Sequence, residues 1–148
     1  MTNLTDSRRN EYFEAILQLR DCEQEVLDFV EEEIPRLKLT VAKTVRIKNG
    51  VDYYLSNNNL TRKIGKKLQE KFGGEFLITA SLHTKKQGKE LFRLTILFRQ
   101  AKFQKGDKVS YQGEEYEIKS MSKEIMLQND KTGKKVRVKY KDMDQIKP

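Results

Sequence analysis

The chain is poor in the residues that build disulfides, zinc sites and membrane spans. It holds one cysteine (Cys22), one histidine (His83), two prolines and no tryptophan among its 148 residues. One cysteine excludes an internal disulfide framework, and one cysteine with one histidine cannot build a tetrahedral zinc site from this chain alone. No segment approaches the roughly 18 uninterrupted apolar residues of a membrane span, and the start has no apolar segment typical of a signal peptide. We therefore expect a soluble, cytoplasmic protein with no metal and no cofactor.

What the chain has in excess is positive charge, and this charge is unevenly distributed. It contains 30 Lys and Arg against 22 Asp and Glu, a formal net charge of +8. Residues 1–33 hold ten acids and three bases, whereas residues 34–148 hold 27 bases and 12 acids. A strongly basic body with one acidic element indicates a polyanionic partner such as a nucleic acid. The alternative is a solvated basic surface that serves solubility alone.

Residues 12–36 have the pattern of a strand followed by a helix. The apolar residues of the strand alternate onto one face: Phe13, Ala15, Leu17 and Leu19. Asp21 is the candidate N-cap of the helix. The helix carries an apolar stripe made of Cys22, Val26, Phe29 and Val30. Its outer face is acidic, and we expect Pro35 to end it.

Residues 41–55 predict a β-hairpin. Asn49-Gly50 lies between two alternating runs, and this dipeptide is the strongest short hairpin signal because both turn residues take positive φ. The side chains expected on the buried face are Val45, Ile47, Val51, Tyr53 and Leu55. One of the adjacent Tyr53 and Tyr54 could stack on a base, although a structural role for both is the favoured interpretation.

Residues 57–74 predict a second helix with an apolar stripe and a basic surface. The stripe recurs every fourth residue, at Leu60, Ile64, Leu68 and Phe72. One of the residues 57–59, all asparagines, caps its start, and Gly73-Gly74 supplies the left-handed C-cap. The helix dipole accounts for the cations in the last turns, Lys67 and Lys71, but not for the earlier ones. Much of this positive charge is therefore not needed for the fold.

Residues 75–99 predict a long hairpin with Gly88 in its turn. The residues expected to face the core are Phe76, Ile78, Ala80, Leu82, Phe92, Leu94, Ile96 and Phe98. The order strand, helix, strand, strand, helix, strand, strand is typical of an α+β, ferredoxin-like two-layer sandwich with an extra strand. We expect an antiparallel sheet with both helices on one face and the other face available for binding.

From residue 101 onward the sequence predicts short strands and no helix of useful length. Turn residues separate these strands at Gln112-Gly113, Ser122-Lys123 and Asn129–Gly133. Closely spaced short strands indicate a small β-barrel. We therefore divide the chain into an α+β sandwich domain, residues 1–100, and a barrel domain, residues 101–148. A core of that size is marginal alone, so we expect the barrel to pack on the first domain.

No set of residues indicates catalysis, and we expect a protein that is not an enzyme. His83 is alone on a predicted strand, and Cys22 lies on an apolar stripe, where a buried thiol is the favoured interpretation. The glycines at 73–74 follow a helix and precede a strand, whereas a phosphate-binding loop needs a strand before and a helix after. The glutamates at 31–33 have no histidine near them in sequence, so they give weak support for a metal site.

The remaining candidate site is a basic surface that would bind RNA phosphates by charge and shape, with little reading of bases. Its members lie on the second helix, the long hairpin, the first hairpin and the barrel. They are Arg62, Lys63, Lys66, Lys67 and Lys71; Lys85, Lys86, Lys89 and Arg93; Lys43, Arg46 and Lys48; and Lys134, Lys135 and Arg137, with Lys131 and Lys139 beside the last group.

The run VRIKNGVDYYLSNNNLTRKIGKKLQEKFGGEFLITASLHTKKQGKELFRLTILFR, with EYFEAILQLR before it, resembles a specific family. It is similar to the nonsense-mediated mRNA decay protein three family, the large-ribosomal-subunit export adaptors of eukaryotes and their archaeal relatives. The likeness covers residues 11–99 and lies in the order and spacing of several short motifs. The tail from Phe103 resembles the SH3-like barrel of translation elongation factor five A, and the family carries a related module next in order. The resemblance implies binding to the large ribosomal subunit, through rRNA and ribosomal proteins, in its maturation or quality control.

Two departures limit what this resemblance implies. Family members begin with paired Cys-x-x-Cys zinc modules, and eukaryotic members carry nuclear transport signals in a longer C-terminal part; this sequence has neither. We therefore expect either a truncated form or a short archaeal-type form lacking the zinc modules. The nuclear-export role is not extended to this chain.

Two other classes of function compete with ribosome binding. A transcription elongation factor that binds RNA polymerase can also pair an α+β domain with a small barrel, and the segment FQKGDKV suits both classes. Against it, EEYEIKS follows Gly113 in place of the glycine-rich continuation expected of that barrel. An RNA-modifying enzyme is disfavoured because catalytic groups are missing. We expect neither a membrane nor a small-molecule substrate among the partners.

Overall fold

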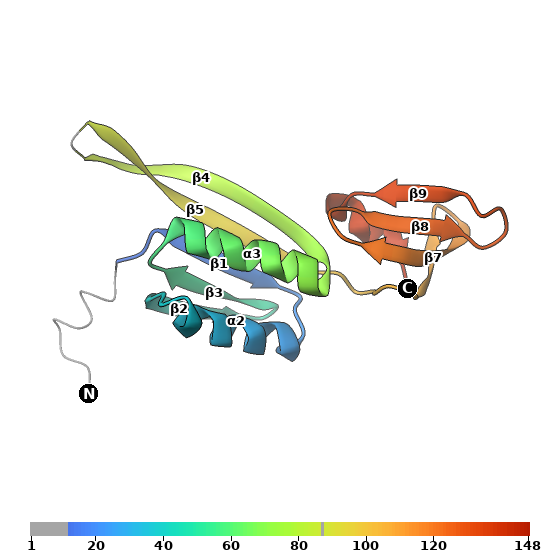
Figure 1. Ribbon diagram of the computed structural model, residues 1–148, viewed down its shortest axis with the longest axis horizontal. Helices are drawn as coiled ribbons and strands as arrows, with labels where there is room; N and C mark the ends of the chain where they lie inside the picture. The colour runs from blue at the N-terminus through green and yellow to red at the C-terminus, as the bar shows by residue number, and fades with distance from the viewer. Residues whose placement is uncertain (1–11, 87) are drawn as a thin grey trace.

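The computed structural model describes residues 12–86 and 88–148, and these residues form two five-stranded sheets (Figure 1). The elements around the first sheet are β1 (Ala15–Arg20), α2 (Gln24–Arg36), β2 (Val41–Ile47), β3 (Gly50–Leu55), α3 (Asn58–Phe72), β4 (Gly74–Lys86) and β5 (Lys89–Gln100). The class is α+β, as the sequence predicts. Neither α-helix in this described part of the chain has the length and apolar character needed to cross a membrane.

The first sheet has the strand order β2-β3-β1-β5-β4, and α2 and α3 share one of its faces (Figure 1). β1 runs antiparallel to β3 but parallel to β5, with Leu17 opposite both Tyr53 and Ile96. The expectation of a fully antiparallel sheet is therefore wrong at one strand pair. The cause is the long hairpin, because β4 takes the outer edge and its return strand β5 enters the place beside β1.

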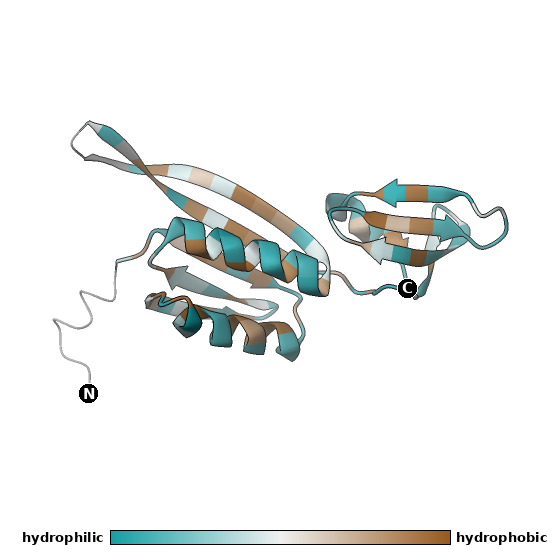
Figure 2. Ribbon diagram, viewed as in Figure 1, coloured by the Kyte–Doolittle hydropathy of each residue, from teal (hydrophilic) through white to brown (hydrophobic). Residues whose placement is uncertain are grey.

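The core of the first part lies between the two helices and the sheet. The stripe predicted for α3 is confirmed, since Ile64 and Leu68 are fully buried and Leu60 and Phe72 pack at the margin. Figure 2 shows that the side of α3 turned to the viewer is mostly hydrophilic. Asn57 is the N-cap, with its Oδ1 accepting the N–H of Leu60 at 2.8 Å. The C-cap is Gly73, the first of the two glycines predicted to end the helix; its φ of 78° is positive, but its ψ of 125° lies outside the predicted left-handed helical conformation.

Gly65 allows α3 to lie close against the sheet. A Cβ at this position would stand 2.7 Å from Cε1 of Phe76 on β4 and 2.8 Å from Cγ2 of Ile96 on β5. Both distances are shorter than van der Waals contact allows, so a larger residue would push the helix outward. Glycine costs helix stability in the middle of a helix, and the close approach explains its presence.

The first helix begins and ends later than the sequence predicts. Its first residue is Gln24, with Glu23 as N-cap, so Asp21 does not cap it. Asp21 instead has a φ of 54°, and its N–H donates to the carbonyl of Asn49 at 2.9 Å. The helix continues to Arg36, which places Pro35 inside its last turn. Proline lacks the N–H group, and so close to the end of a helix this removes only one backbone hydrogen bond.

The first hairpin forms with a turn different from the expected one. Ile47 pairs with Gly50, so the turn consists of Lys48 and Asn49, and neither Asn49 nor Gly50 has a positive φ. The prediction of two positive φ angles is therefore wrong. Glycine is needed at position 50 for a different reason, because a Cβ there would collide with the carbonyl oxygen of Leu19 on β1.

The register of this hairpin turns part of the predicted core outward. Of the predicted set, the β3 residues are buried: Val51, Tyr53 and Leu55. Val45 pairs with Asp52, which places both on the sheet face away from the helices, and Ile47 on the same face is 43 % exposed. The prediction is therefore wrong for Val45 and Ile47. The two-residue turn sets this register, and a shift of one residue reverses every side chain of a strand.

The outer parts of β4 and β5 extend beyond α3 as a two-stranded arm (Figure 1). Ile96 and Phe98, at the base of the hairpin, are fully buried as predicted. Ile78, opposite Ile96 on the edge strand β4, is 38 % exposed; farther out, Ala80 is exposed and Leu82 and Phe92 are 51 and 45 % exposed. The predicted burial is wrong for these four residues, which lie outside the cluster of buried residues that α2 and α3 form with the sheet.

The second sheet contains β6 (Lys108–Tyr111), β7 (Glu114–Met121), β8 (Ile125–Asn129), β9 (Lys135–Val138) and β10 (Ile146–Lys147), in the order β10-β6-β7-β8-β9. The turn predicted at Gln112-Gly113 is confirmed, with φ angles of 49° and 81°. The sequence did not predict the 3-10 helix η1 (Tyr140–Gln145), which buries Tyr140 and Met143 against this sheet.

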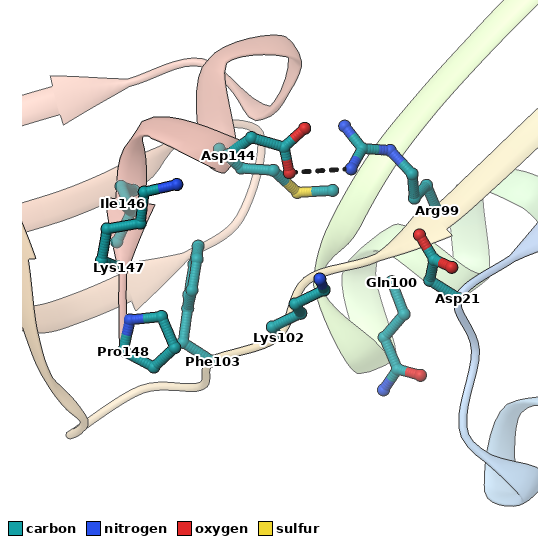
Figure 3. A pocket seen from close by; sticks show the side chains of 10 residues that line it. Asp21, Arg99, Gln100, Lys102, Phe103, Asp144, Ile146, Lys147 and Pro148 are labelled. Carbon is teal, nitrogen blue, oxygen red and sulfur yellow. Dashed lines mark hydrogen bonds and ion pairs between the residues drawn. The ribbon is translucent and has the colours of Figure 1, made fainter.

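Two sets of contacts connect the second sheet to the first. Arg99 of β5 donates to Asp144 of η1 at 3.0 Å and to Glu75 of β4 at 3.2 Å. Figure 3 shows Arg99 and Asp144 meeting at the edge of a cavity of about 440 Å³. On the other side, Met121 of β7 lies against Gly73 at the end of α3. These contacts agree with the expectation that residues 101–148 pack on the first part.

Candidate nucleic-acid interface

The basic residues of α3 point in three directions, because the helix buries one side. The buried side consists of Thr61, Ile64, Gly65 and Leu68. Lys63 and Lys66 lie on the opposite side and are exposed. In residues 12–86 and 88–148, neither of these two lysines forms an ion pair with a carboxylate. The folded chain therefore leaves their charges available to a partner.

Lys67 turns toward α2, where it meets a buried carboxylate. Its Nζ donates to Oε2 of Glu33 at 3.1 Å, and Arg36 donates to both oxygens of the same carboxylate at 2.7 and 2.8 Å. Hydrogen bonds from Arg36, and then from Lys67, lower the pKa of Glu33 from 4.5 to about 2. Lys67 therefore has a structural partner, and its charge is partly compensated within the chain.

The two remaining cations of α3 also have neighbours in the structure. Lys71 stands 5.7 Å from the ring centroids of Phe29 on α2 and Phe72 on α3, a cation–π arrangement between the helices. Arg62 turns toward the arm, and its Nη2 donates to Oδ1 of Asn59 at 3.1 Å. No carboxylate described in the structure forms an ion pair with Arg62 or Lys71.

The cations of the first hairpin lie on opposite faces of the sheet. Lys43 pairs with Tyr54 on the face away from the helices, and its Nζ stands 4.9 Å from the Tyr54 ring centroid. Arg46 pairs with Val51 on the helix side, where it lines a cavity that Glu31 of the acidic helix also lines. Lys48 is exposed in the turn between the strands. The structure therefore does not bring Lys43 and Arg46 together.

The arm places its cations near its tip and at its base. Lys89, the first residue of β5, is exposed beside the turn at Gly88. Lys85 and Lys86 belong to β4, but their side chains lie outside the described residues. Arg93 is half-buried on the face away from the helices, with its Cζ 3.8 Å from the Phe13 ring centroid and its Nε donating to the Phe13 carbonyl at 3.3 Å.

The cations predicted near the end of the chain form a separate group on the second sheet. Lys134, Lys135 and Arg137 are exposed and lie at or before the edge strand β9. Lys131 and Lys139, on either side of this strand, are exposed as well. The predicted basic surface is therefore several groups, of which the outer side of α3 is the one with the clearest uncompensated charge.

The residues considered for catalysis or metal binding have the following surroundings in the structure. Cys22 is half-buried and its Sγ donates to the carbonyl of Arg20 at 3.3 Å, while burial raises the pKa of its thiol to about 11. His83 is exposed at a bulge between Leu82 and Thr84. Glu33 is held in the ion pairs with Arg36 and Lys67. Across the two described ranges, three or more His, Cys, Asp or Glu residues do not come together as a metal site would require.

Comparison with known protein families shows to which family this chain is related. The family described as NMD3, second domain, matches residues 12–99. The chain belongs to the NMD3 family. No curated protein matches it. The NMD3 match extends from the segment before β1 to the end of β5, so it includes α3 and the arm and leaves the second sheet outside.

Two residues of the surface were missed by reasoning from sequence. Lys123, in the turn between β7 and β8, lines a cavity of about 590 Å³ together with Lys66 and Phe76 of the NMD3-matched segment. Lys123 reaches this cavity only because the second sheet packs against the first, and no local sequence pattern predicts that packing. Phe13 was assigned to the core, but it packs edge to face on Tyr54 with ring centroids 4.9 Å apart. The chain bends at Glu14, just before β1, and this breaks the alternation.

Proposed function

We propose that this chain is a non-catalytic factor that binds the large ribosomal subunit, through rRNA and ribosomal proteins, in its maturation or quality control. Membership of the NMD3 family supports the ribosomal partner. The observation that carries the RNA contact is the exposed pair Lys63 and Lys66, which have no ion-pair partner in the described residues. Cations held on a rigid helix bind phosphates and fix orientation without reading sequence.

The residues proposed to meet rRNA form a first group on α3 and a second group on the other elements. Lys63, Lys66 and Arg62 are the main contacts, with Lys71 beside them. Lys67 contributes less because Glu33 already compensates it. Lys48, Lys89 and the group Lys134, Lys135 and Arg137 extend the surface as exposed cations.

The proposal also divides the chain into two domains. We assign residues 1–100 to the NMD3-type sandwich and residues 101–148 to a small SH3-like barrel. Two hydrophobic clusters, one on each sheet, support the division. The strand order β10-β6-β7-β8-β9, with a 3-10 helix before the last strand, supports the SH3-like assignment. The alternative partner, RNA polymerase, has no support from the family match.

The test is the salt dependence of binding to purified large-subunit rRNA. If about six cations meet phosphates, the logarithm of the association constant falls against the logarithm of salt concentration with a slope of roughly −4 to −5. The double variant Lys63→Glu/Lys66→Glu should weaken binding and flatten the slope while the melting temperature stays unchanged. The matched control is Lys105→Glu/Lys141→Glu, which makes the same change of charge at two other exposed lysines.

Three outcomes would contradict the proposal. The first is an affinity that does not depend on salt, and the second is a double variant that binds rRNA as tightly as the control. The third comes from a pull-down with the full chain: recovery of RNA polymerase subunits without large-subunit rRNA would favour the transcription-factor alternative.

A further inference from the structure

The face of the first sheet away from α2 and α3 is left open by the described chain. Residues of the central strands that point to this face are half-buried, among them Ile16, Tyr54 and Leu97, whereas their neighbours on the helix side are buried. Neither α-helix of the described residues packs on it, and at one edge the 3-10 helix η1 contacts it through the ion pair of Asp144 with Arg99 at 3.0 Å. Figure 1 views the sheet from the other side, with both helices in front.

Two adjacent aromatic rings with a cation at each end form a row across this open face. We call Arg93, Phe13, Tyr54 and Lys43 the aromatic–cation row. Arg93 lies 3.8 Å from the Phe13 ring centroid, Phe13 meets Tyr54 at 4.9 Å with an interplanar angle of 85°, and Lys43 lies 4.9 Å from the Tyr54 ring centroid. The four residues come from β5, the segment before β1, β3 and β2, so the row exists only in the folded sheet.

The charges of the row are uncompensated, unlike those of its neighbours. On the same face, Arg20 is paired with Asp52 at 2.7 Å and Arg99 with Glu75 at 3.2 Å. Among the carboxylates whose side chains the structure describes, none forms an ion pair with Lys43 or Arg93. The face therefore presents two cations beside two flat rings, which suits a ligand that carries both negative charge and flat π surfaces.

Unpaired RNA is the ligand with this combination. Its bases stack on aromatic rings and on guanidinium planes, and its phosphates pair with Lys and Arg. Double-stranded RNA hides the faces of its bases inside the helix, and an acidic peptide brings charge without flat rings. Either alternative ligand would therefore contact the cations of the row but leave its aromatic rings without a stacking partner.

The row is continuous with the basic surface of α3. Phe13 and Arg93 line a cavity of about 630 Å³ together with Arg62 and Asn58 at the start of α3, and with Phe92 of the arm. Asn58 ties these parts together, since its Nδ2 donates to the carbonyl of Phe92 at 3.0 Å. A strand of RNA that meets Arg62 would therefore reach the row through this cavity.

We propose that the open face of the first sheet binds unpaired RNA, with bases stacked on the Arg93–Phe13 and Tyr54–Lys43 pairs and phosphates held by the two cations. This inference rests on the proposed rRNA binding and assigns to it a second surface, distinct from the outer side of α3. Tyr54 and Phe13 supply the stacking, and Arg93 supplies both a plane and a charge.

The experiment measures the affinity of the full chain for a fluorescein-labelled oligouridylate of about 10 nucleotides and for a fully paired, blunt-ended RNA duplex, by fluorescence anisotropy. Tyr54→Leu keeps an apolar side chain but removes the ring, and should lower the affinity for the oligouridylate about tenfold. The slope against salt should stay unchanged because no cation is lost. Binding of the duplex should not change.

Three further variants separate stacking from stability. Tyr54→Phe keeps the ring and should bind the oligouridylate as the unmodified chain does. Arg93→Lys keeps the charge but loses the planar group, and should weaken binding of the oligouridylate more than that of the duplex. Tyr111→Leu is the matched control, because Tyr111 is also half-buried and packed edge to face on a tyrosine, but on the second sheet; it should have no effect.

Two results would overturn this inference. One is oligouridylate binding by Tyr54→Leu that equals binding by the control. The other is unchanged RNA binding by Tyr54→Leu together with loss of a purified ribosomal protein, which would make the open face a protein-docking surface. Failure of the proposed function is a different result: Lys63→Glu/Lys66→Glu would then bind large-subunit rRNA normally, whatever the Tyr54 variants do.

Discussion

Lys67 of α3 donates to Glu33 of α2 at 3.1 Å, and this ion pair joins the basic helix to the acidic one. Glu33 is buried, and Arg36 holds the same carboxylate from its own helix. A glutamate that could be taken for part of a solvated acidic face is therefore an element of the helix packing. A lysine predicted to bind RNA has the same structural role, and both findings have measurable consequences.

Glu33 should make the stability of the protein sensitive to acid. Its pKa falls from 4.5 to about 2 on folding, so its contribution is fully present above pH 4.5 and is lost as the pH falls through about 2. Glu33→Gln should lower the free energy of unfolding by about 1–2 kcal/mol at pH 7. Urea unfolding should show this difference shrinking between pH 4.5 and pH 2. Glu32→Gln, at the exposed neighbouring position, is the control; a difference that stays constant with pH would exclude this role for Glu33.

Lys67 should contribute less to RNA binding than Lys66, although the two residues are adjacent on α3. Part of the Lys67 charge is matched by Glu33, whereas Lys66 has no ion-pair partner in the described chain. Lys66→Gln should reduce the salt slope of rRNA binding by about 0.9, the value of one phosphate contact, and Lys67→Gln by clearly less. Equal changes for the two variants, measured by filter binding over a salt series, would show that the ion pair opens when RNA binds.

Local patterns in the sequence predict local structure well here. The apolar stripe of α3 and the turn at Gln112-Gly113 depend on residues that are near one another in the chain, and both are confirmed. The N-cap was narrowed to three asparagines, and the structure selects Asn57, because only its Oδ1 accepts the N–H of Leu60. The sequence also predicts that Lys63 and Lys66 are not needed for the fold, because the apolar stripe lies on the opposite side of the helix.

Features set by strand register or by contacts between distant segments could not be predicted from the sequence. The register that turns Val45 and Ile47 outward depends on the exact length of one turn. The insertion of β5 beside β1 depends on which strand of the long hairpin takes the edge of the sheet. The pairing of Lys67 with Glu33 requires two helices to lie side by side. In each case the sequence patterns are compatible with more than one arrangement, and only the folded structure shows which one forms.

Gly65→Ala should destabilise the protein, although alanine is the better helix former. The helix-propensity gain is about 1 kcal/mol, but the new methyl would stand 2.7 Å from the Phe76 ring and 2.8 Å from Ile96. Overpacking of this kind costs about 1–3 kcal/mol, so the net effect on the free energy of unfolding in urea should be a loss. Lys63→Ala, exposed on the same helix, should change it by less than about 0.5 kcal/mol.

A second substitution tests the cause of that loss. Phe76→Leu removes the ring that the Gly65→Ala methyl would meet, so the double variant should lose less stability than the sum of the two single variants. Simple additivity would show that the helix moves away from the sheet and that the ring is not the obstacle.

Cys22 should react slowly with alkylating reagents in the folded protein. Burial raises the pKa of its thiol from 9.0 to about 11, and only the thiolate is nucleophilic. It is the one cysteine of the chain, so thiol modification by iodoacetamide can be followed at a single site, from the mass of the peptide that contains Cys22. The rate should continue to rise with pH beyond 10 in the folded chain, whereas in urea it should level off near the ordinary pKa of 9.0. A folded-state rate that levels off at the same pH as the unfolded one would mean that the thiol is reached by water, and that the packing of α2 against the end of β1 is looser than the structure shows.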